Sequence, residues 1–584
     1  MKTSGQIRPQ NSPPSALPAK SRELLSPWAA FLAVVVLAAV VFAIYSPALH
    51  FQFILDDHRF TGDPRLQSSG HLWEYFTSFV WSQVPGGPVS FYRPLFLLWL
   101  RLNFILSGAS PWAWHLFSVA KHVSVAVLLG LLAWKLLRDR VAAVMAAALF
   151  ALHPAQTESV AWVTVPDPLM SAAVLGALLL YLKYAEEAYA NSQPLAGRFH
   201  RKGRKQARGK SAGGTSTLWL IASVVACLAA LMAKETAVIL PVVLFGLALI
   251  TPLHAVEGKD AASERKTGLG PRLLSAFRQM LPFAVVTVAY LLLRLHALGE
   301  HLSPLTQHLP WKTVVLSWPA TLWFYVKVLF WPLRSRAFAD PSVEQTFSFP
   351  GVALPALGVF CAAVILAGFC FWARKTALRD LPNREAAGVQ RALLLGVLLL
   401  VLPLLLTLNL NSLNPGDFLH GRYTYLPLAG LMLLLATGWH LAKKGRTAWL
   451  AIAGVVAVVF CVLTLQQESA WKDDLTVFTV GHEIAPHNAP VAQSLVRAHV
   501  QVALSLDEAG RCEEAMPIFD DAIHQYPKDW YAWAGRGECF FKLDDLQNSE
   551  QSLRRAYELS HLPRVKEEWQ LVREKMGLPA LPLD

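Results

Sequence analysis

Residues 28–59, "WAAFLAVVVLAAVVFAIYSPALHFQFILDDHR", decide the fold class of this chain. They open with an apolar run that ends at Tyr45 and is long enough to cross a bilayer, which takes about 20 helical residues. Because the apolar core of a secretory signal peptide has only about 7–15 residues, we interpret the run as an anchor that stays in the membrane. Cleavage near residues 46–48 is the alternative. Two adjacent carboxylates, Asp56 and Asp57, follow at the mouth of this first span and need an explanation.

The composition places most of the chain in a membrane. Of its 584 residues, 54% are hydrophobic and only 16% are charged, whereas soluble domains carry about 25% charged residues. Recurrent apolar runs predict an all-α polytopic membrane helical bundle of about eleven spans within residues 28–465, after a disordered segment, residues 1–27. The predicted spans are 28–46, 113–134, 141–157, 168–186, 217–233, 236–252, 279–297, 350–373, 391–409, 424–442 and 447–465.

The loops between these runs alternate in charge. Every second loop is basic, and residues 198–210, "RFHRKGRKQARGK", form the longest basic run. This positive-inside pattern argues against a nucleic-acid-binding face and predicts a cytoplasmic N-terminus and an extracytoplasmic C-terminus in a bacterial inner membrane. Residues 311–332 are apolar, but a crossing there would invert every later loop, so we expect them to be re-entrant or to lie in the outer interface. Residues 47–111 are expected to form a structured first outer loop.

The composition changes at about residue 466, and the tail that follows contains a repeat. Four positions of one unit recur 34 residues later, where Ala515, Phe519, Ala522 and Pro527 are matched by Ser549, Leu553, Ala556 and His561. This period, with small residues at fixed positions, is typical of tetratricopeptide repeats, which stack into an α-solenoid. We expect residues 466–584 to be an extracytoplasmic repeat domain that binds acceptor or partner proteins. Cys512 and Cys539 fall in neighbouring repeat helices, where a disulfide is one of the alternatives.

Charged side chains near a bilayer are costly, about 2.5–3.5 kcal/mol each at the centre of a spanning helix, so those that remain call for a function. The polar residues predicted to lie at or near the outer membrane face are Asp56, Asp57, His58, Arg59, Arg93, Arg101, His153, Glu158, Asp167, Lys234, Glu235, Lys327, Asp417, His420 and Arg422. This mixture suits the transfer of a sugar from a polyprenyl phosphate. Fixed cations neutralise the phosphate leaving group, and one carboxylate takes the proton of the acceptor hydroxyl.

A divalent metal is an alternative in such a site, because paired carboxylates can hold one. No third carboxylate stands at a spacing that demands it, so we do not favour a metal and expect no bound cofactor.

Five short motifs carry a resemblance to a known family: "FILDDHRFTGDPRL", "FYRPL", "HPAQTESVAWV", "AKETAVILP" and "GRYTYLPLAG". Together with the repeat tail, they resemble the transmembrane and tetratricopeptide-repeat protein O-mannosyltransferases, which are lipid-donor glycosyltransferases of the GT-C class. The resemblance covers residues 25–559. It implies a GT-C-like bundle and an enzyme that moves a sugar, mannose in that family, from a polyprenyl-phosphate carrier to a hydroxyl acceptor, a protein Ser or Thr in the first place.

The resemblance also implies roles for individual residues. It makes Asp56 or Asp57 the base and adds Glu158 as a catalytic residue. The residues implied to bind the lipid phosphate or the substrate are Arg93, His153, Lys234, Glu235, Arg422 and Tyr423. The chain departs from the family at residues 165–169, "VPDPL", where the usual Arg is missing, so no role is assigned to Asp167.

Structural roles are the alternatives to these assignments. The acid pair could cap a loop helix or pair with Arg59, and Lys234 could pair with Glu235. Arg93 could anchor the first loop, and Arg422 could extend its charge to the interface. For the whole protein, the alternatives are a non-catalytic membrane scaffold whose repeats gather envelope-assembly partners, and a transporter, which requires acids near the bilayer midplane.

Overall fold

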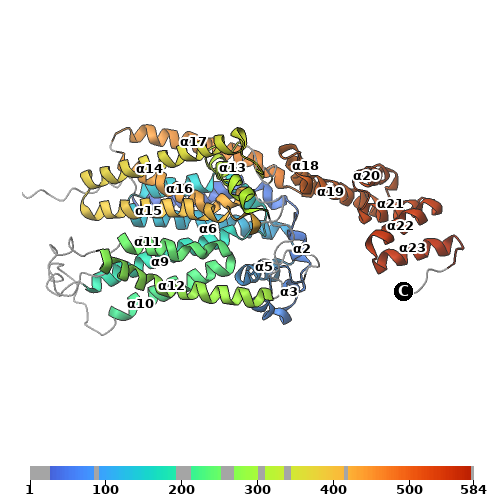
Figure 1. The fold of residues 1–584 in the computed structure, drawn as a ribbon, viewed down its shortest axis with the longest axis horizontal. Helices are drawn as coiled ribbons and strands as arrows, with labels where there is room; N and C mark the ends of the chain where they lie inside the picture. The colour runs from blue at the N-terminus through green and yellow to red at the C-terminus, as the bar shows by residue number, and fades with distance from the viewer. Residues whose placement is uncertain are drawn as a thin grey trace, which may run out of the picture.

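The computed structural model describes residues 26–83, 91–192, 212–250, 269–299, 309–333, 338, 343–412, 419–442 and 444–579. Residues 1–25, the basic run at 198–210 and Asp417 lie outside the described residues. The described part is helical and contains no strand. Figure 1 shows a long helical bundle from one end of which a smaller array of helices projects. We call this the repeat end of the bundle, and the opposite end the basic end.

The bundle helices match the eleven predicted spans. They are α1 (Pro27–Ile44), α6 (Pro111–Leu137), α7 (Arg140–Ala151), α9 (Asp167–Ser192), α10 (Ala212–Ala233), α11 (Leu240–Ile250), α12 (Leu269–Leu298), α14 (Leu354–Asp380), α15 (Asn383–Leu406), α16 (Tyr425–Leu441) and α17 (Arg446–Glu468). All of these except α7 and α11 are long and apolar enough to cross a membrane. The prediction of an all-α polytopic membrane bundle is therefore confirmed.

Two helices are shorter than their predicted spans, because the chain leaves the helix at a polar residue. α7 was expected to run to residue 157 but ends at Ala151, since the residue before a proline disfavours the helical conformation and His153 precedes Pro154. α11 was expected to start at residue 236, but Lys234 is extended and a 3₁₀ turn, η5 (Glu235–Ile239), comes before the α-helix. Both breaks bring polar side chains to the repeat end.

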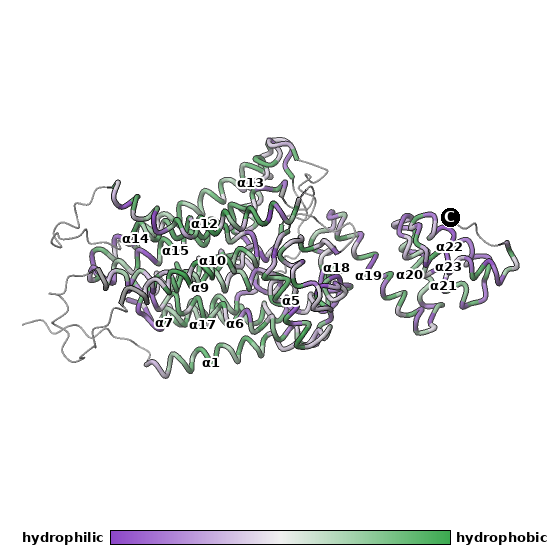
Figure 2. Tube along the Cα trace, turned by 90° about the horizontal axis from the view of Figure 1, so that it is seen from below, coloured by the Kyte–Doolittle hydropathy of each residue, from purple (hydrophilic) through white to green (hydrophobic). Residues whose placement is uncertain are grey.

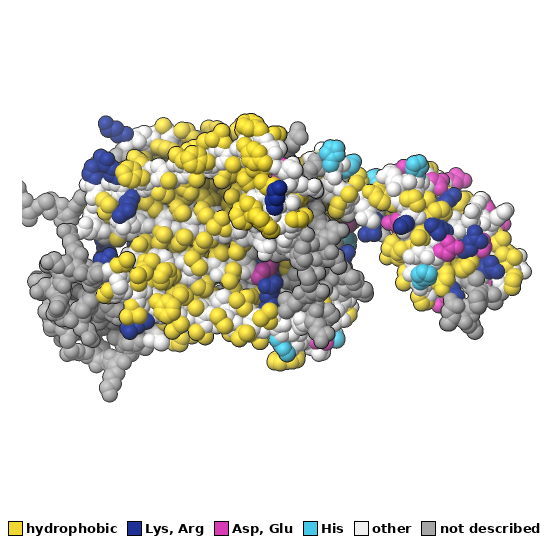
Figure 3. Space-filling model, viewed as in Figure 1, with side chains coloured by type: hydrophobic (Ala, Val, Ile, Leu, Met, Phe, Trp, Pro, Cys, Tyr) yellow, Lys and Arg dark blue, Asp and Glu magenta, His cyan; other side chains and the backbone are white. Residues whose placement is uncertain are grey.

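The outer surface of the bundle is apolar, as a lipid-facing surface should be. In the most apolar stretch of α16, 83% of the residues are buried, against 6% in α17. Figure 2 shows hydrophobic residues along the bundle helices and hydrophilic ones at their ends. On the face drawn in Figure 3, Lys and Arg gather at the basic end. α16 is thus a central helix, and α17 presents its side chains to lipid.

Two glycines let α15 and α16 approach closely. A Cβ atom on Gly430 would lie 2.5 Å from the Leu400 nitrogen and 2.6 Å from the Gly396 carbonyl oxygen. Small residues allow such close contact between membrane helices. This contact fixes the position of α16, whose preceding turn, η10 (Gly421–Thr424), carries part of the candidate site.

Helix α13 (Trp311–Phe330) is long enough to span but is attached to the repeat end at both of its ends. Before it, the Leu309 nitrogen donates to Asn411 Oδ1 (2.9 Å), which follows α15. At its end, the Leu329 carbonyl oxygen lies 3.1 Å from His153 Nε2, which follows α7. These contacts tie α13 to the repeat end, and the expectation that residues 311–332 do not make a further crossing stays a prediction.

The first loop has its own small core. Its helices are α2 (Asp57–Thr61), α3 (Pro64–Gln67), α4 (Glu74–Thr77) and α5 (Pro94–Ser107), with a short turn, η1 (Pro47–His50), before them. Arg65 is fully buried and pairs with Asp63 at 2.6 Å. Its guanidinium also donates to Ser78, Phe79 and Ser82, so one buried cation joins the start of α3 to residues 78–82 of the loop.

The tail consists of consecutive packed helices: α18 (Asp474–Ile484), α19 (Ala489–Glu508), α20 (Cys512–Gln525), α21 (Trp530–Lys542), α22 (Leu546–Ser560) and α23 (Pro563–Lys575). The positions predicted to be equivalent on α20 and α22 are alike in burial. Ala515, Phe519 and Ala522 are buried, and so are Ser549, Leu553 and Ala556.

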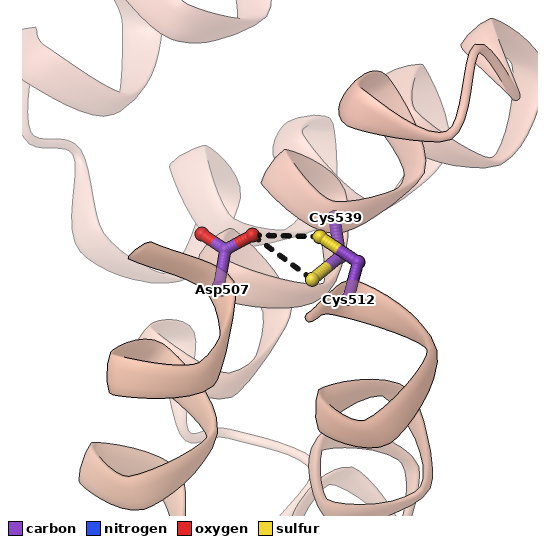
Figure 4. A group of neighbouring side chains, drawn as sticks. All are labelled: Asp507, Cys512 and Cys539. Carbon is purple, nitrogen blue, oxygen red and sulfur yellow. Dashed lines mark hydrogen bonds between the residues drawn. The ribbon is translucent and has the colours of Figure 1, made fainter. Parts of the chain in front are cut away.

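The two repeat cysteines are free thiols in this structure. Both donate to the same oxygen, Asp507 Oδ1, with Cys512 at 2.9 Å and Cys539 at 3.0 Å (Figure 4). The other oxygen, Oδ2, accepts from Lys542 at 3.0 Å. The cysteines lie side by side as predicted, but a buried carboxylate holds them, and no disulfide joins them.

Candidate active site

The candidate site is assembled from short turns that interrupt the bundle at the repeat end. Its acidic and basic side chains come from the start of α5, from η5, from the start of α9, from η10 and from α8 (Thr157–Ala161). A turn carries polar side chains at a helix end without breaking the apolar surface of the helix itself. The elements are far apart in the sequence, so the site depends on the packing of the bundle.

One deeply buried ion pair of the site joins Lys234 to Asp167. The Lys234 ammonium lies 2.7 Å from each carboxylate oxygen, and both side chains are buried. The ammonium also lies over the ring of Tyr423, 4.9 Å from its centre. Asp167 stands in the stretch for which the sequence assigned no role, so this partner of Lys234 was missed.

Arg93 pairs with Glu235 through two parallel hydrogen bonds, of 2.9 Å to Oε2 and 2.6 Å to Oε1. Such a two-pronged geometry is the strong form of the arginine–carboxylate interaction. It joins the start of α5 to η5. The alternative that Lys234 pairs with its neighbour Glu235 is wrong, because the two side chains have separate partners.

Arg422 is held by Glu158. The carboxylate accepts from the Arg422 backbone nitrogen (2.9 Å) and from its Nη1 (3.2 Å), and His420 Nδ1 lies 3.3 Å away. The guanidinium stacks over the ring of Trp162 at 4.6 Å. Glu158 is buried, so its carboxylate orients Arg422 from behind and does not face solvent.

Three cations thereby share one neighbourhood, which we call the cation cluster: Arg93, Lys234 and Arg422. The pKa of Lys234 is lowered from its usual value, and burial is the main cause. Asp167 opposes this shift, whereas the positive charges of Arg93 and Arg422 add to it. Arg93 keeps 12% of its side chain exposed and Arg422 keeps 16%. Each cation is held by its own carboxylate, which fixes its position. A bound anion would therefore meet the two guanidinium groups already in place.

The acid turn, residues 54–58, lies on the first loop, and its two carboxylates differ in environment. Asp57 is fully buried, and its Oδ1 accepts from the backbone nitrogen (3.2 Å) and the hydroxyl (2.6 Å) of Thr164. Burial raises the pKa of Asp57 from 3.8 to about 7, although the bonds from Thr164 oppose this shift. Asp56 keeps 38% of its side chain exposed and lies 3.9 Å from Arg59.

The first helix of the tail, α18, holds the acid turn in place. Asp474, the first residue of α18, accepts from the Leu55 nitrogen (2.8 Å) and pairs with His58 Nε2 (3.1 Å). Leu55 has a positive φ of 53°, which is unfavourable for a leucine and needs such support. The bond with Asp474 raises the pKa of His58. Nothing in the local sequence of the acid turn indicated this partner.

The structure changes the interpretation of His153 and adds Lys121, a residue that the sequence did not single out. Both ring nitrogens of His153 are engaged, Nε2 with the Leu329 carbonyl oxygen and Nδ1 with the Ala155 nitrogen (3.2 Å), so it ends α7 and starts the next turn. Lys121 on α6 was not singled out. It is buried and lies over the ring of Trp99, at 5.5 Å.

Comparisons with known proteins agree with the resemblance seen in the sequence. Protein O-mannosyl-transferase TMTC3 of Mus musculus is 24% identical over 545 residues, which is 89% of this chain and 54% of that protein. Protein O-mannosyl-transferase TMTC1 of Homo sapiens is 25% identical over 518 residues, or 83% of this chain and 54% of its own length. The chain resembles the TMTC O-mannosyl-transferases. It spans about half the length of these curated relatives.

No protein-family model matches the chain. Among solved structures, the archaeal oligosaccharyltransferase AglB from Archaeoglobus fulgidus, in complex with an inhibitory peptide and a dolichol-phosphate, aligns with 80% of this chain and 59% of its own. The identity is 13% and the TM-score 0.40. ArnT from Cupriavidus metallidurans, bound to undecaprenyl phosphate, aligns with 89% of this chain and 79% of its own, with 14% identity and a TM-score of 0.36.

Proposed function

We propose that this integral membrane protein is a glycosyltransferase. It moves a sugar from a polyprenyl-phosphate carrier to the hydroxyl of a protein Ser or Thr at the repeat end of the bundle. Mannose is the proposed sugar, because the TMTC relatives bear the name O-mannosyl-transferase. The repeat end faces the extracytoplasmic side of a bacterial inner membrane, with the N-terminus in the cytoplasm. The observation that carries the proposal is the cation cluster at this end, where the first loop brings the acid turn.

The cation cluster provides the donor side of the reaction. A sugar leaves its lipid phosphate as negative charge develops on the phosphate, and fixed cations stabilise that charge. Arg93 and Arg422 each use part of a guanidinium, which has five donors, on a carboxylate. The exposed part of each side chain contacts the phosphate. Lys234 is buried and its ammonium lies over the ring of Tyr423, so it adds positive charge to the cluster.

The acid turn provides the acceptor side. A base must reach the acceptor proton, and of the two acids only Asp56 has an exposed carboxylate. We assign the base to Asp56. Asp57 fixes the turn against Thr164, and Glu158 and Glu235 orient Arg422 and Arg93. These three are positioning residues, and His153 has no direct role.

One observation favours the scaffold as a second candidate. A scaffold requires its carboxylates to be paired within the protein, and Glu158, Asp167 and Glu235 are indeed paired with cations. The partly exposed Asp56 distinguishes the two functions, since a scaffold has no need of its carboxylate.

The test is a transfer assay with the purified full-length protein in lipid nanodiscs, a radiolabelled polyprenyl-phosphate mannose and a Ser/Thr peptide. Wild type should transfer label, also in excess EDTA, because no metal takes part in the proposed reaction. Asp56→Asn should lose at least a hundredfold, in line with the loss of a general base. Arg564→Gln, which removes an exposed cation of the tail helix α23, serves as the control. Normal transfer by folded Asp56→Asn would refute the assignment of the base, and absence of transfer with any donor lipid would support the scaffold.

A further inference from the structure

A cleft lies between the first loop and the repeats. Its volume is about 350 Å³. Arg59 of α2 lines one side, and Arg497 of α19 together with residues 528–531, at the start of α21, line the other. The cleft therefore joins a repeat surface to the loop that carries the acid turn.

The charge of the cleft is positive. Arg59, Arg497 and Lys528 contribute three cations, against one carboxylate, Asp529. Asp529 is already engaged, since its Oδ2 lies 3.5 Å from Arg497 Nε and its Oδ1 accepts from the Tyr531 nitrogen at 3.0 Å to cap α21. Lys528 has no ion-pair partner within the described ranges. The cleft thus has an excess of cations that face solvent.

An aromatic surface lies beside these cations. The rings of Trp530 and Tyr531 stack with their centres 3.7 Å apart and their planes at 26°. Tyr531 is 48% exposed. Aromatic side chains with arginine next to them are typical of protein-binding surfaces, because they offer large contact areas at a low cost in conformational entropy.

We propose that this cleft binds an extended acidic segment of the acceptor polypeptide, next to the Ser or Thr that receives the sugar. The proposal rests on the proposed function for the identity of the ligand as acceptor. Arg59 lies 3.9 Å from Asp56, so a segment bound by Arg59 passes beside the proposed base. A volume of 350 Å³ is at the lower end of the range for binding pockets and suits a few residues only. Acidic residues close to the acceptor hydroxyl are therefore the recognised feature.

Binding is measured directly, without transfer, by fluorescence anisotropy of labelled peptides with full-length protein in nanodiscs of neutral lipid. One peptide carries Glu on both sides of a central Thr, and a second carries Gln at the same positions. The Glu peptide should bind at least tenfold more tightly at low salt, and this preference should decrease as salt screens the charges. Equal affinity for the two peptides would overturn the proposal.

Variants then locate the binding site. Lys528→Glu breaks no ion pair and should weaken binding of the Glu peptide about tenfold, and Arg497→Gln should weaken it about threefold. The control, Arg554→Glu with Arg564→Glu, reverses two exposed cations on α22 and α23 and should change affinity less than twofold. Equal loss in the control, or binding to anionic vesicles that survives Lys528→Glu while peptide binding is absent, would overturn the proposal.

The proposal and the proposed function can fail separately. If the Glu peptide binds through Lys528 but no donor lipid supports transfer, the cleft stands and the enzyme assignment fails. If transfer occurs with a KM for the Glu peptide that Lys528→Glu leaves unchanged, the enzyme assignment stands and the cleft fails. Tight binding together with a raised KM in Lys528→Glu supports both.

Discussion

At the scale of single residues, the site is a set of buried and half-buried charges that hold one another in place. Each cation of the cluster has its own carboxylate, and each carboxylate comes from a different part of the chain. A buried ion pair contributes little net stability, but the removal of one partner leaves an uncompensated charge and costs about 3–5 kcal/mol. These pairs therefore keep fixed charges at the repeat end, and they make single substitutions there costly.

The pair of Lys234 and Asp167 offers a prediction that separates stability from function. Lys234→Met should lower thermal stability strongly because Asp167 is left buried and unpaired, a cost of about 3–5 kcal/mol. Lys234→Met combined with Asp167→Leu should recover most of that stability but no transfer activity, because the positive charge stays absent. The measurements are thermal unfolding in nanodiscs and the transfer assay. Recovery of both properties in the double variant would make the pair purely structural.

Asp57 predicts a pH dependence of stability. Because burial raises its pKa from 3.8 to about 7, the folded protein keeps a proton that the unfolded chain has lost. The corresponding stability is present in full below about pH 4 and is lost as the pH rises through 7, in total roughly 4 kcal/mol. The unfolding temperature of wild type should therefore decrease more steeply between pH 5 and pH 8 than that of Asp57→Asn. Asp56→Asn, with its exposed side chain, should keep the wild-type slope, and equal slopes in all three would contradict the raised pKa.

At the scale of elements, helix packing fixes the turns that carry the site. The contact of Gly396 with Gly430 sets the distance between α15 and α16, and η10 with Arg422 leads directly into α16. Similarly, Asp474 at the start of α18 supports the acid turn. In both places an element outside the site controls the geometry inside it.

Gly430→Ala should destabilise the protein, since the new Cβ would lie 2.5 Å from a backbone nitrogen of α15 and force the helices apart. Overpacking of this kind costs about 1–3 kcal/mol. Gly454→Ala in α17 is the matched control, because it has open space around it and removes only a flexible residue from a helix. Thermal unfolding should show a lower midpoint for Gly430→Ala and an equal or higher one for Gly454→Ala. An unchanged midpoint for Gly430→Ala would show that the helices are farther apart.

Asp474→Ala should loosen the acid turn, because Leu55 loses the partner that supports its positive φ and His58 loses its carboxylate. We expect faster proteolysis within residues 54–62 and a lower kcat, with donor KM unchanged. Asp474→Asn keeps an acceptor for the Leu55 nitrogen and should rescue part of both effects. The control is Asp521→Ala on α20, an exposed residue whose carboxylate accepts a hydrogen bond from Gln525. Identical protease sensitivity in Asp474→Ala and wild type would refute the role of Asp474.

At the scale of the whole molecule, the site, the first loop and the repeats lie together at one end of an apolar bundle, and the basic residues of α14 lie at its far end. In the proposed function, a donor dissolved in lipid and an acceptor dissolved in water meet at this end. It also makes the orientation of the protein in the membrane a direct test of the proposed function.

Cysteine labelling measures this orientation. In a variant without native cysteines, Arg59→Cys at the repeat end should react with a membrane-impermeant maleimide on intact cells. Lys444→Cys, in the connection between α16 and α17, should react only after permeabilisation, as the positive-inside rule requires. Labelling of Lys444→Cys from outside would invert the topology and remove the extracytoplasmic reaction.

Most of the side chains that form the paired clusters stood out in the sequence, while their role in a site stays a prediction. Charge at the mouth of a span is costly and therefore conspicuous, and this singled out Arg93, Lys234, Glu235 and Arg422, all of which lie in the paired clusters. Partners were not predictable, because Lys234 and Asp167 are 67 residues apart and Arg422 and Glu158 are 264 apart. Asp167 was set aside for lack of a neighbouring arginine, yet its partner is the distant Lys234.

The sequence by itself determined that the chain is a helical membrane bundle with a helical tail. Lipid has no water to satisfy backbone groups, so long apolar runs have to be helices whatever lies beside them. Only the tertiary structure decided which acid faces solvent, which carboxylate orients which cation, and that α18 supports the acid turn. Burial and pairing arise between residues far apart in the chain, and no local pattern records them.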